Sequence, residues 1–210
     1  MEQSYFNYNI KPNLSIDNFF VSQSNDYAYN VLINQNIKNN KFFLVGPNKS
    51  GKTHLSCIWM HKFNAIKYNS NLNEIINNNN NILIEDLSIN LYEEDIFHII
   101  NHCNLYNLKI LITSSQFLHD YSFNLKDLQS RLKTFLDIKI DLPDDELLMN
   151  LMIKLLHDKQ IIITNPKIFD YILKRVHRSY EKVFLLIDQI DKLLLKENKQ
   201  LTIPLIKELI

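Results

Sequence analysis

Residues 46–53 have the types and the spacing of a loop that binds phosphate groups. They fit the pattern G-x-x-x-x-G-K-[ST] at every required position. In such a loop the backbone N–H groups surround the phosphates, the lysine reaches the β- and γ-phosphates, and the final hydroxyl binds Mg²⁺. The chain contains 2 glycines and both lie here, where a Cβ would block the approach of the backbone to a phosphate. The loop consists of Gly46, Pro47, Asn48, Lys49, Ser50, Gly51, Lys52 and Thr53.

The segments on either side of this loop have the composition that the motif requires. Residues 41–45 are a short, mostly apolar run typical of a buried strand. Residues 53–61 contain no glycine or proline and favour a helix. A strand, a loop and a helix in this order place the free N–H groups of the helix N-terminus next to the phosphates. The alternative is a chance match in an ordinary turn, which the flanking segments and the scarcity of glycine disfavour.

The acidic residues Glu85 and Asp86 follow the apolar run 82–84. This run predicts a buried strand, and acids at the carboxyl end of such a strand are the usual partners of a phosphate loop. We expect Glu85, together with Thr53, in the shell of a Mg²⁺ ion, and Asp86 to orient or deprotonate an attacking water. The alternative is a strand that ends in solvated acids, and without the loop it would be the better interpretation.

A pair of histidines, His98 and His102, lies beside Cys103 with the i, i+4 spacing of some zinc ligands. The glutamate of the H-E-x-x-H pattern is missing, and the sequence shows no second group of ligands. We therefore expect ordinary histidines on the surface of a helix over residues 93–106.

The composition limits the class of protein. A formal net charge of +0 provides no basic field that would draw the chain onto nucleic acid. The 2 cysteines are far apart in the chain, which suits a reducing cytosol rather than a disulfide framework. No apolar run approaches the ~20 residues of a membrane span, and the first residues do not resemble a signal peptide. We expect a cytoplasmic protein without a membrane segment.

Strands and helices alternate in the first part of the chain, and only helices are expected from residue 146 onward. A first helix is expected from residue 26 to about residue 35, capped by Asn25. Its inward side chains would include Tyr27 and Val31. The order predicts an α/β fold in which helices cover a five-stranded parallel sheet, followed by a small all-helical lid. The strands are expected at residues 41–45, 65–68, 82–84, 109–115 and 135–140.

A set of segments in a fixed order carries a family resemblance. They are the loop with residues 53–55, the segment 19–25 that leads into the module, the acids 85–86, the strand end 113–115, the helix 127–132, residues 143–148 and residues 201–208. Together they resemble the AAA+ module of the bacterial replication initiator DnaA and, more closely, its short homologue Hda in the form found in alphaproteobacteria. The resemblance covers nearly the whole chain, and the ordered set is more specific than the phosphate loop alone.

The resemblance implies an AAA+ P-loop NTPase module that binds ADP or ATP with Mg²⁺. It divides the chain into a flexible arm over residues 1–12, an α/β nucleotide-binding domain over 13–142 and a helical lid over 143–210. It also implies that the nucleotide is contacted by residues outside the loop. These are Asn25, His54, Ser114 and Arg178.

The first partner that the resemblance implies is the AAA+ domain of DnaA. Arg131 corresponds to an arginine that projects onto the γ-phosphate held by a neighbouring subunit. Acting in trans as an arginine finger, it would stimulate the hydrolysis of ATP bound to DnaA. The alternative is a surface arginine that pairs with Asp127, one helical turn earlier.

The second implied partner is the sliding clamp of DNA polymerase III. Residues 3–8 are similar to the short N-terminal peptide with which Hda-like proteins bind this clamp. Phe6 and Tyr8 would fill an apolar pocket, and Gln3 would form a hydrogen bond at its rim.

Three positions depart from the family pattern. Lys49 stands where the loop usually has glycine, and Glu85 stands where the Mg²⁺ ligand is usually aspartate. Glu181 falls at the lid position of a second sensor arginine, for which Arg178, one turn earlier, is a candidate substitute. We therefore expect weak or no intrinsic ATPase activity, and ADP rather than ATP as the resident nucleotide.

The expected function is regulation of the initiation of chromosome replication. The protein would bind ADP or ATP and the clamp, stimulate hydrolysis of DnaA-bound ATP and so prevent over-initiation. No helix-turn-helix follows the lid, so direct sequence-specific DNA binding is not expected, and assembly of several copies is compatible with an AAA+ module. The main alternative is a self-hydrolysing AAA+ ATPase of the helicase-loader or DNA-remodelling type. A nucleotide-free scaffold is a third, disfavoured because both glycines are retained in the loop.

Overall fold

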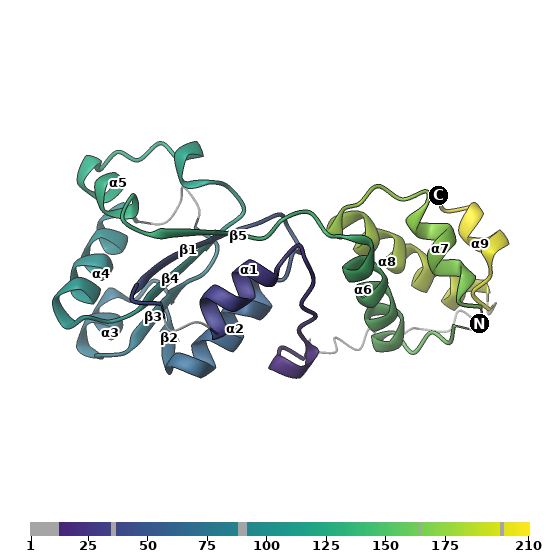
Figure 1. The fold of residues 1–210 in the computed structure, drawn as a ribbon, viewed down its shortest axis with the longest axis horizontal. Coiled ribbons are helices and arrows are strands. Elements are labelled where there is room, and N and C mark those ends of the chain that lie inside the picture. Colours follow the sequence, from purple (N-terminus) through teal and green to yellow (C-terminus); the bar gives the residue numbers. More distant parts are fainter. Residues whose placement is uncertain (1–12, 35–36, 88–91, 164, 198–199) are drawn as a thin grey trace, which may run out of the picture.

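The sheet of the first part of the chain has five strands in the order β2-β3-β4-β1-β5, and all its pairings are parallel (Figure 1). The computed structural model describes residues 13–34, 37–87, 92–163, 165–197 and 200–210. The predicted five-stranded parallel sheet is thus confirmed. The strands are β1 Lys41–Val45, β2 Ala65–Lys67, β3 Asn81–Ile84, β4 Ile110–Ser114 and β5 Leu136–Lys139.

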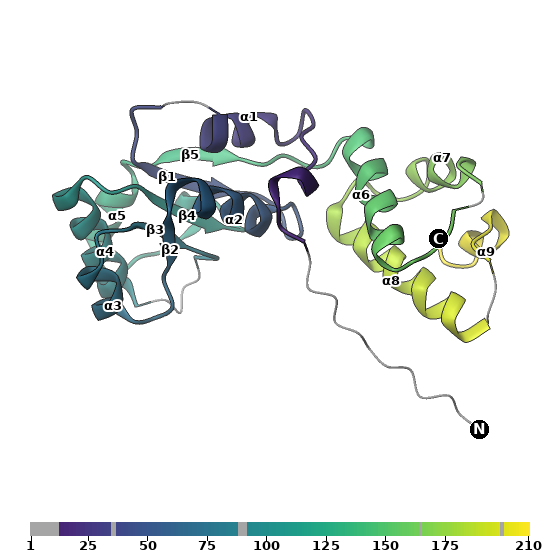
Figure 2. The ribbon, with the colours of Figure 1, turned by 90° about the horizontal axis from the view of Figure 1, so that it is seen from below.

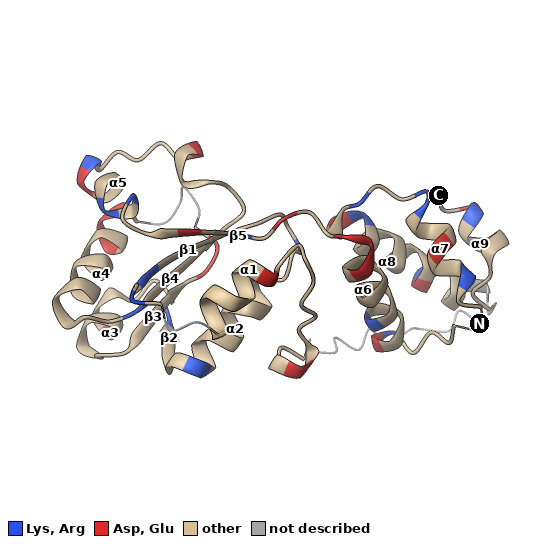
Figure 3. Cartoon of the chain, in the orientation of Figure 1, with Lys and Arg blue, Asp and Glu red and all other residues tan. Residues whose placement is uncertain are grey.

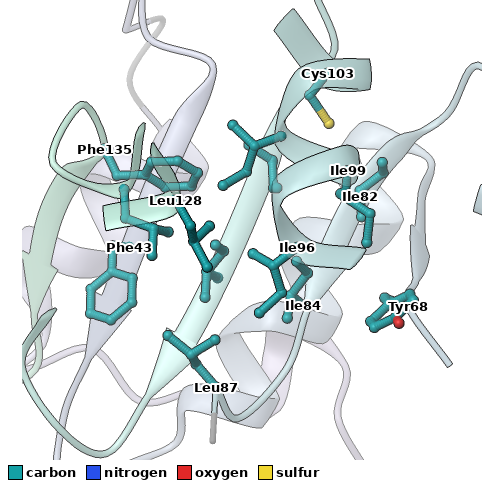
Figure 4. Close-up of a cluster of buried hydrophobic side chains, with 14 of the residues drawn as sticks. Phe43, Tyr68, Ile82, Ile84, Leu87, Ile96, Ile99, Cys103, Leu128 and Phe135 are labelled. Carbon is teal, nitrogen blue, oxygen red and sulfur yellow. The ribbon is translucent and has the colours of Figure 1, made fainter. Parts of the chain in front are cut away.

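Helices cover both faces of this sheet, because successive side chains of a strand point to opposite faces. Phe43 and Ile82 belong to the core under α3, α4 and α5, whereas Leu44 and Leu83 belong to the core under α1 and α2. Figure 4 shows the first of these cores, with Ile96 of α4 facing the strands. The helices are α1 Asp26–Tyr29, α2 Lys52–Phe63, α3 Leu72–Asn77, α4 Glu93–Tyr106 and α5 Lys126–Leu132.

The first helix differs from its prediction. Its α-helical part ends at Tyr29 and continues as a π-helical turn over Asn30–Asn34. Tyr27 is 56% exposed, because the buried face is formed by Ala28, Val31 and Leu32, at helical spacing from one another. Tyr27 lies one residue off that face, so the prediction that it points inward was wrong.

The side chain of Asn25 does not cap this helix either. Its carbonyl oxygen accepts a hydrogen bond from the N–H of Ser22 (2.8 Å), and its amide donates to the carbonyl of Phe20 (2.8 Å). The side chain is turned back towards the residues that precede the helix. It therefore stabilises this entry segment, residues 13–25, rather than the end of the helix.

The second part of the chain is all-helical and has its own core, built around residues such as Met152, Ile168, Ile187 and Ile206. Figures 1 and 2 show this lid beyond the end of the sheet, joined to it by the segment that follows β5. None of the helices that the structure describes is long and apolar enough to cross a membrane. The lid helices are α6 Asp145–Asp158, α7 Lys167–Leu173, α8 Tyr180–Glu197 and α9 Ile203–Lys207.

Charged side chains of both signs are dispersed over the sheet domain and the lid (Figure 3), in line with the formal net charge of +0. Among the residues that the structure describes, this view shows no single basic stripe of the kind that usually marks a nucleic-acid-binding face.

Asp144 joins the start of the lid to the entry segment. One carboxylate oxygen accepts from the N–H of Leu147 (2.7 Å) and caps α6, and the other accepts from the N–H of Ser24 (3.2 Å). Desolvation alone would raise the pKa of this carboxyl group, but the hydrogen bonds from Leu147, Ser22 and Ser24 outweigh it and lower the pKa.

Replacing Asp144 with alanine should lower the free energy of unfolding by about 1 kcal/mol, the usual cost of a lost N-cap. Asp144→Asn keeps an acceptor oxygen and is the matched control, which should retain most of the stability. The pKa of Asp144 is lower in the folded than in the unfolded protein. The extra stability of the wild type over Asp144→Ala should therefore be present above the unfolded pKa of about 4, and it should vanish as the pH falls through the folded pKa. Urea denaturation at several pH values measures this, and a difference that stays constant into the acidic range would contradict it.

Candidate functional site

The loop after β1 is held in a tight conformation by its own lysine. The ammonium of Lys52 donates to the carbonyl oxygens of Gly46 (2.8 Å) and Pro47 (2.9 Å). Desolvation lowers the pKa of Lys52, and the nearby carboxylate of Asp86 partly opposes this. The loop thus places a cation at its centre, at the N-terminus of α2, where a phosphate group would be bound.

The glycines of the loop serve separate purposes. A Cβ on Gly46 would lie 2.9 Å from the hydroxyl of Ser50 and 3.0 Å from the Cβ of Ile140, closer than van der Waals contact. Gly51 has φ +91°, a conformation that L side chains rarely adopt. Lys49 also has a positive φ, +64°, without being a glycine.

The predicted Mg²⁺ ligands are close together. The hydroxyl of Thr53, in the first turn of α2, forms a hydrogen bond with the carboxylate of Glu85, which follows β3 and is also paired with Lys67. Desolvation raises the pKa of Glu85, but the hydrogen bonds with Lys67 and Thr53 and the charge of Lys67 lower it overall. Glu85 is therefore held ionised, as a Mg²⁺ ligand must be.

These groups fit a magnesium site that a nucleotide completes. In the described ranges no cluster of three or more His, Cys, Asp or Glu side chains forms a metal site by itself. Mg²⁺ is usually held by one or two protein groups together with phosphate oxygens and water. Thr53 and Glu85 would supply the protein ligands, and the bound ion would neutralise charge on the phosphates.

The backbone holds Asp86 beside this pair. Its N–H donates to the hydroxyl of Thr113 (2.9 Å), at the end of β4, and its φ is +57°. A left-handed backbone at an aspartate is uncommon, and such positions occur at turns and functional sites.

The expectation for Ser114 needs correction. Its side chain is 0% exposed, and its hydroxyl bonds with the hydroxyl of Tyr121 (2.7 Å), the carbonyl of Gln116 (2.8 Å) and the N–H of Gln116 (2.9 Å). The hydroxyl therefore ties the strand end to the following segment and is not available to a phosphate. Side chains alternate along a strand, so the polar strand end alone does not tell which hydroxyl faces the site.

A cleft of about 80 Å³ lies beside the loop, between the entry segment and the lid. The ring of Phe19 in its wall stacks on Tyr29 (5.6 Å between centroids) and meets the edge of His54 (5.2 Å). An apolar slot with aromatic walls next to a phosphate loop suits a flat aromatic base. The cleft is lined by Asn18, Phe19, Phe20, Asn25, Lys49, Ser50, Gly51, His54, Leu147, Leu151, Lys154 and Tyr180.

Asn25 and His54, which were predicted to contact the nucleotide, both line this cleft, but their polar atoms have partners within the protein. The Nε2 atom of His54 is 2.8 Å from the carbonyl oxygen of Ser15, and desolvation lowers the pKa of the ring. Both residues therefore shape the wall of the cleft. The lid residues Leu151 and Lys154 were not predicted, because nothing in the pattern of α6 distinguishes its cleft-facing side.

Arg178 is engaged in an ion pair within the lid. Its guanidinium forms a two-pronged ion pair with Asp145 at the start of α6, with both N–O distances at 2.7 Å. Glu181 lies exposed in the first turn of α8. A contact between Arg178 and a nucleotide stays a prediction, and it would require the pair with Asp145 to open.

Arg131 lies on α5, which α4 positions at two points. The guanidinium carbon of Arg131 is 4.9 Å from the ring centroid of Phe97. The carboxylate of Glu93 accepts from the N–H groups of Asn124 (3.0 Å) and Leu125 (2.7 Å), at the N-terminus of α5. Within the described residues Arg131 makes no ion pair with Asp127, the alternative considered above.

Figures 1 and 2 place α5 beside α4, at the end of the sheet domain away from the lid. The helix that carries Arg131 is therefore remote from the cleft, which lies against the lid. The predicted clamp-binding residues Gln3, Phe6 and Tyr8 lie outside the described residues.

The histidines of α4 differ in their surroundings. His98 is exposed, as expected, but His102 is buried, 7% exposed, with its ring 4.7 Å from that of Tyr106. The prediction of two surface histidines was thus wrong for His102. The i, i+4 spacing puts both on one side of the helix, but only the ring of His102 is covered, in part by the ring of Tyr106.

The parallel sheet with the phosphate loop after β1, the acids after β3 and a separate helical lid define an AAA+ P-loop NTPase module. A family model described as the lid domain of Hda matches residues 151–210. The chain belongs to the Hda/DnaA-homologue family of AAA+ proteins.

The relatives that support this membership are replication initiators. DnaA of Buchnera aphidicola subsp. Baizongia pistaciae is 31% identical over 184 residues, which cover 70% of this chain and 40% of that protein. DnaA of Buchnera aphidicola subsp. Cinara cedri is 24% identical over 240 residues, which cover 99% of this chain and 55% of that protein. The chain thus spans about half the length of these relatives.

Solved structures agree on the fold. Domain III of DnaA from Thermotoga maritima has a TM-score of 0.73 at 18% identity, covering 94% of this chain and 95% of that one. AMPPCP-bound DnaA from Aquifex aeolicus has a TM-score of 0.67 at 20% identity, covering 87% and 66%.

Replacing Thr53 with valine should remove the advantage that Mg²⁺ gives to nucleotide binding, because the hydroxyl ligand is lost while the shape is kept. A polar contact to a charged group is worth roughly 1.5 kcal/mol or more, which is about tenfold in affinity. Thr53→Ser retains the hydroxyl and is the control. Titration of a fluorescent nucleotide with and without Mg²⁺ measures the effect, and equal Mg²⁺ dependence in all three proteins would exclude Thr53 as a ligand.

Proposed function

We propose that this protein regulates the initiation of chromosome replication by stimulating, in trans, the hydrolysis of ATP bound to DnaA, and so prevents over-initiation. The observation that carries the proposal is the placement of Arg131. It lies on a helix remote from the protein's own cleft, and Phe97 and Glu93 of α4 hold that helix in place. An arginine so placed would act on a nucleotide bound to another molecule rather than on the one in this cleft.

The chemistry required of Arg131 is electrostatic. A guanidinium beside the γ-phosphate stabilises the charge that develops there during phosphoryl transfer, an effect of about 10³–10⁵ on the rate in related systems. The AAA+ domain of DnaA is the partner that fits, since the family of this chain is that of DnaA and the lid matches that of Hda. The reaction takes place in the partner's loop, and this chain supplies the cation.

The protein's own loop would hold ADP or ATP with Mg²⁺. Lys52, the glycines and the pair Thr53–Glu85 fit the phosphates and the metal, and the aromatic cleft fits the base. A carboxylate at position 181 repels a γ-phosphate, which favours ADP and weak or no intrinsic ATPase activity. The bound nucleotide would then set the shape of the module more than serve as a substrate.

The remaining parts of the proposal follow from the family resemblance. The protein would act in the cytoplasm, attached to the DNA polymerase III sliding clamp by Gln3, Phe6 and Tyr8. It would not read DNA sequence itself, which agrees with the dispersed charges, and it would not need a membrane. Assembly with DnaA, or with further copies of itself, would be head-to-tail.

The decisive experiment measures hydrolysis of DnaA-bound ATP with this protein, ADP and DNA-loaded clamp. The wild-type protein should accelerate this hydrolysis, by at least about 10³-fold if Arg131 acts as an arginine finger. With Arg131→Ala the hydrolysis should fall back to the unstimulated rate. Arg131→Lys keeps the charge but loses the planar fork and should rescue only partly. Binding of ADP by Arg131→Ala serves as the control for folding. Full stimulation by Arg131→Ala would refute the role.

Binding to the clamp is tested separately. A peptide of residues 1–10 should bind the cognate clamp, and Gln3→Ala should weaken the binding of the full-length protein, because the hydrogen bond at the pocket rim is lost. Surface plasmon resonance on immobilised clamp measures both. If the peptide does not bind and Gln3→Ala has no effect, the arm has another role.

A second candidate function is a self-hydrolysing AAA+ ATPase of the helicase-loader or DNA-remodelling type. It is favoured by the contact of Thr53 with Glu85 and by Asp86 beside them, which together form an intact set of hydrolytic residues. Rapid turnover of ATP by the isolated protein, independent of DnaA, would support this alternative over the regulator.

A further inference from the structure

We propose that Lys49 is a lid-positioning residue: its ammonium, bound to the ring of Phe184, holds α8 against the phosphate loop and slows the release of bound nucleotide. The inference rests on the proposed binding of ADP or ATP in the cleft. It concerns a contact between the loop and the lid in which none of the residues proposed for hydrolysis takes part.

The backbone at Lys49 is the first observation. Its φ of +64° is left-handed, and for a residue other than glycine this conformation costs roughly 1–2 kcal/mol. The loop uses glycine at 46 and 51, where a Cβ or the φ value requires it. A strained lysine between them indicates that the side chain contributes something that glycine cannot.

The contact made by the side chain is the second observation. The Nζ atom of Lys49 lies 5.3 Å from the ring centroid of Phe184, which is within the range of a cation–π interaction. Phe184 is half-buried in α8, and Figures 1 and 2 place α6 and the start of α8 on the side of the lid that faces the sheet domain. The contact therefore ties the loop directly to the lid.

The position of the contact at the cleft is the third observation. Lys49 lines the cleft from the loop side, and Leu147, Leu151 and Tyr180 line it from the lid side. Other links between the parts start from the entry segment or the linker, such as the ammonium of Lys154 on the carbonyl of Asn18 (3.1 Å). A nucleotide in this cleft would leave by separating the lid from the loop, which requires the Lys49–Phe184 contact to break.

The experiment measures the release rate of fluorescent ADP in a stopped-flow chase, with the full chain and no DnaA. Phe184→Leu and Lys49→Met should each release ADP about two to five times faster, the equivalent of one exposed cation–π contact. Phe184→Tyr and Lys49→Arg keep the interaction and should restore the slow rate. Leu185→Ala, on the exposed side of the same helix, is the matched control and should not change it.

A double-mutant cycle separates the proposed contact from other effects. If the two residues act on each other, Phe184→Leu combined with Lys49→Met should release ADP no faster than either single variant. Additive effects, or an effect of Lys49→Met with none of Phe184→Leu, would overturn the proposal and indicate that Lys49 acts on the phosphate instead. A wild-type protein that binds no adenine nucleotide would refute the proposed cofactor and this inference together, whereas normal binding with an unchanged Phe184→Leu rate would refute this inference alone.

Discussion

The parallel register of β1 between β4 and β5 is the constraint on which the candidate site depends. Val45 pairs with Ser114 on one side and with Lys139 on the other, so the carboxyl ends of these strands meet at one edge. The N–H of Gly46 donates to the carbonyl of Ser114 (3.2 Å), and the N–H of Ile140 donates to the carbonyl of Val45 (2.8 Å). The loop therefore leaves the sheet through a space too narrow for a Cβ. A slip of this register would displace the loop from the acids that follow β3.

The cleft and Arg131 lie at opposite ends of the sheet domain (Figures 1 and 2). The cleft lies where the entry segment, the loop and the lid meet, and side-chain contacts such as Asp144 with Ser24 and His54 with Ser15 hold this region together. Arg131 lies at the other end of the sheet domain. In such an arrangement a bound nucleotide would influence the lid while the arginine would be left to act on a different molecule, which is the division of roles that the proposed function needs.

Most of the fold was predictable because its signals act over short distances. The five strands, the loop and α4 were located from apolar runs and helical spacing, and α4 has the bounds that were expected, residues 93–106. Thr53 and Glu85 were predicted as Mg²⁺ ligands from the phosphate-loop pattern and from the acids after a buried strand. The structure brings their side chains together, and their binding of a metal stays a prediction. The first helix was less predictable, since its short α-helical part and its π-helical turn depend on packing against the sheet.

The sequence by itself thus determined the class of fold and the identity of the phosphate loop, because glycine, lysine and a hydroxyl at fixed spacing act through the local backbone. Only the tertiary structure decided which polar groups are free. Ser114 is consumed by internal hydrogen bonds and Arg178 by Asp145, while Lys49 reaches Phe184 of the lid. These outcomes depend on partners that are distant in the chain, and the free energy of each contact exists only once the fold has brought the partners together.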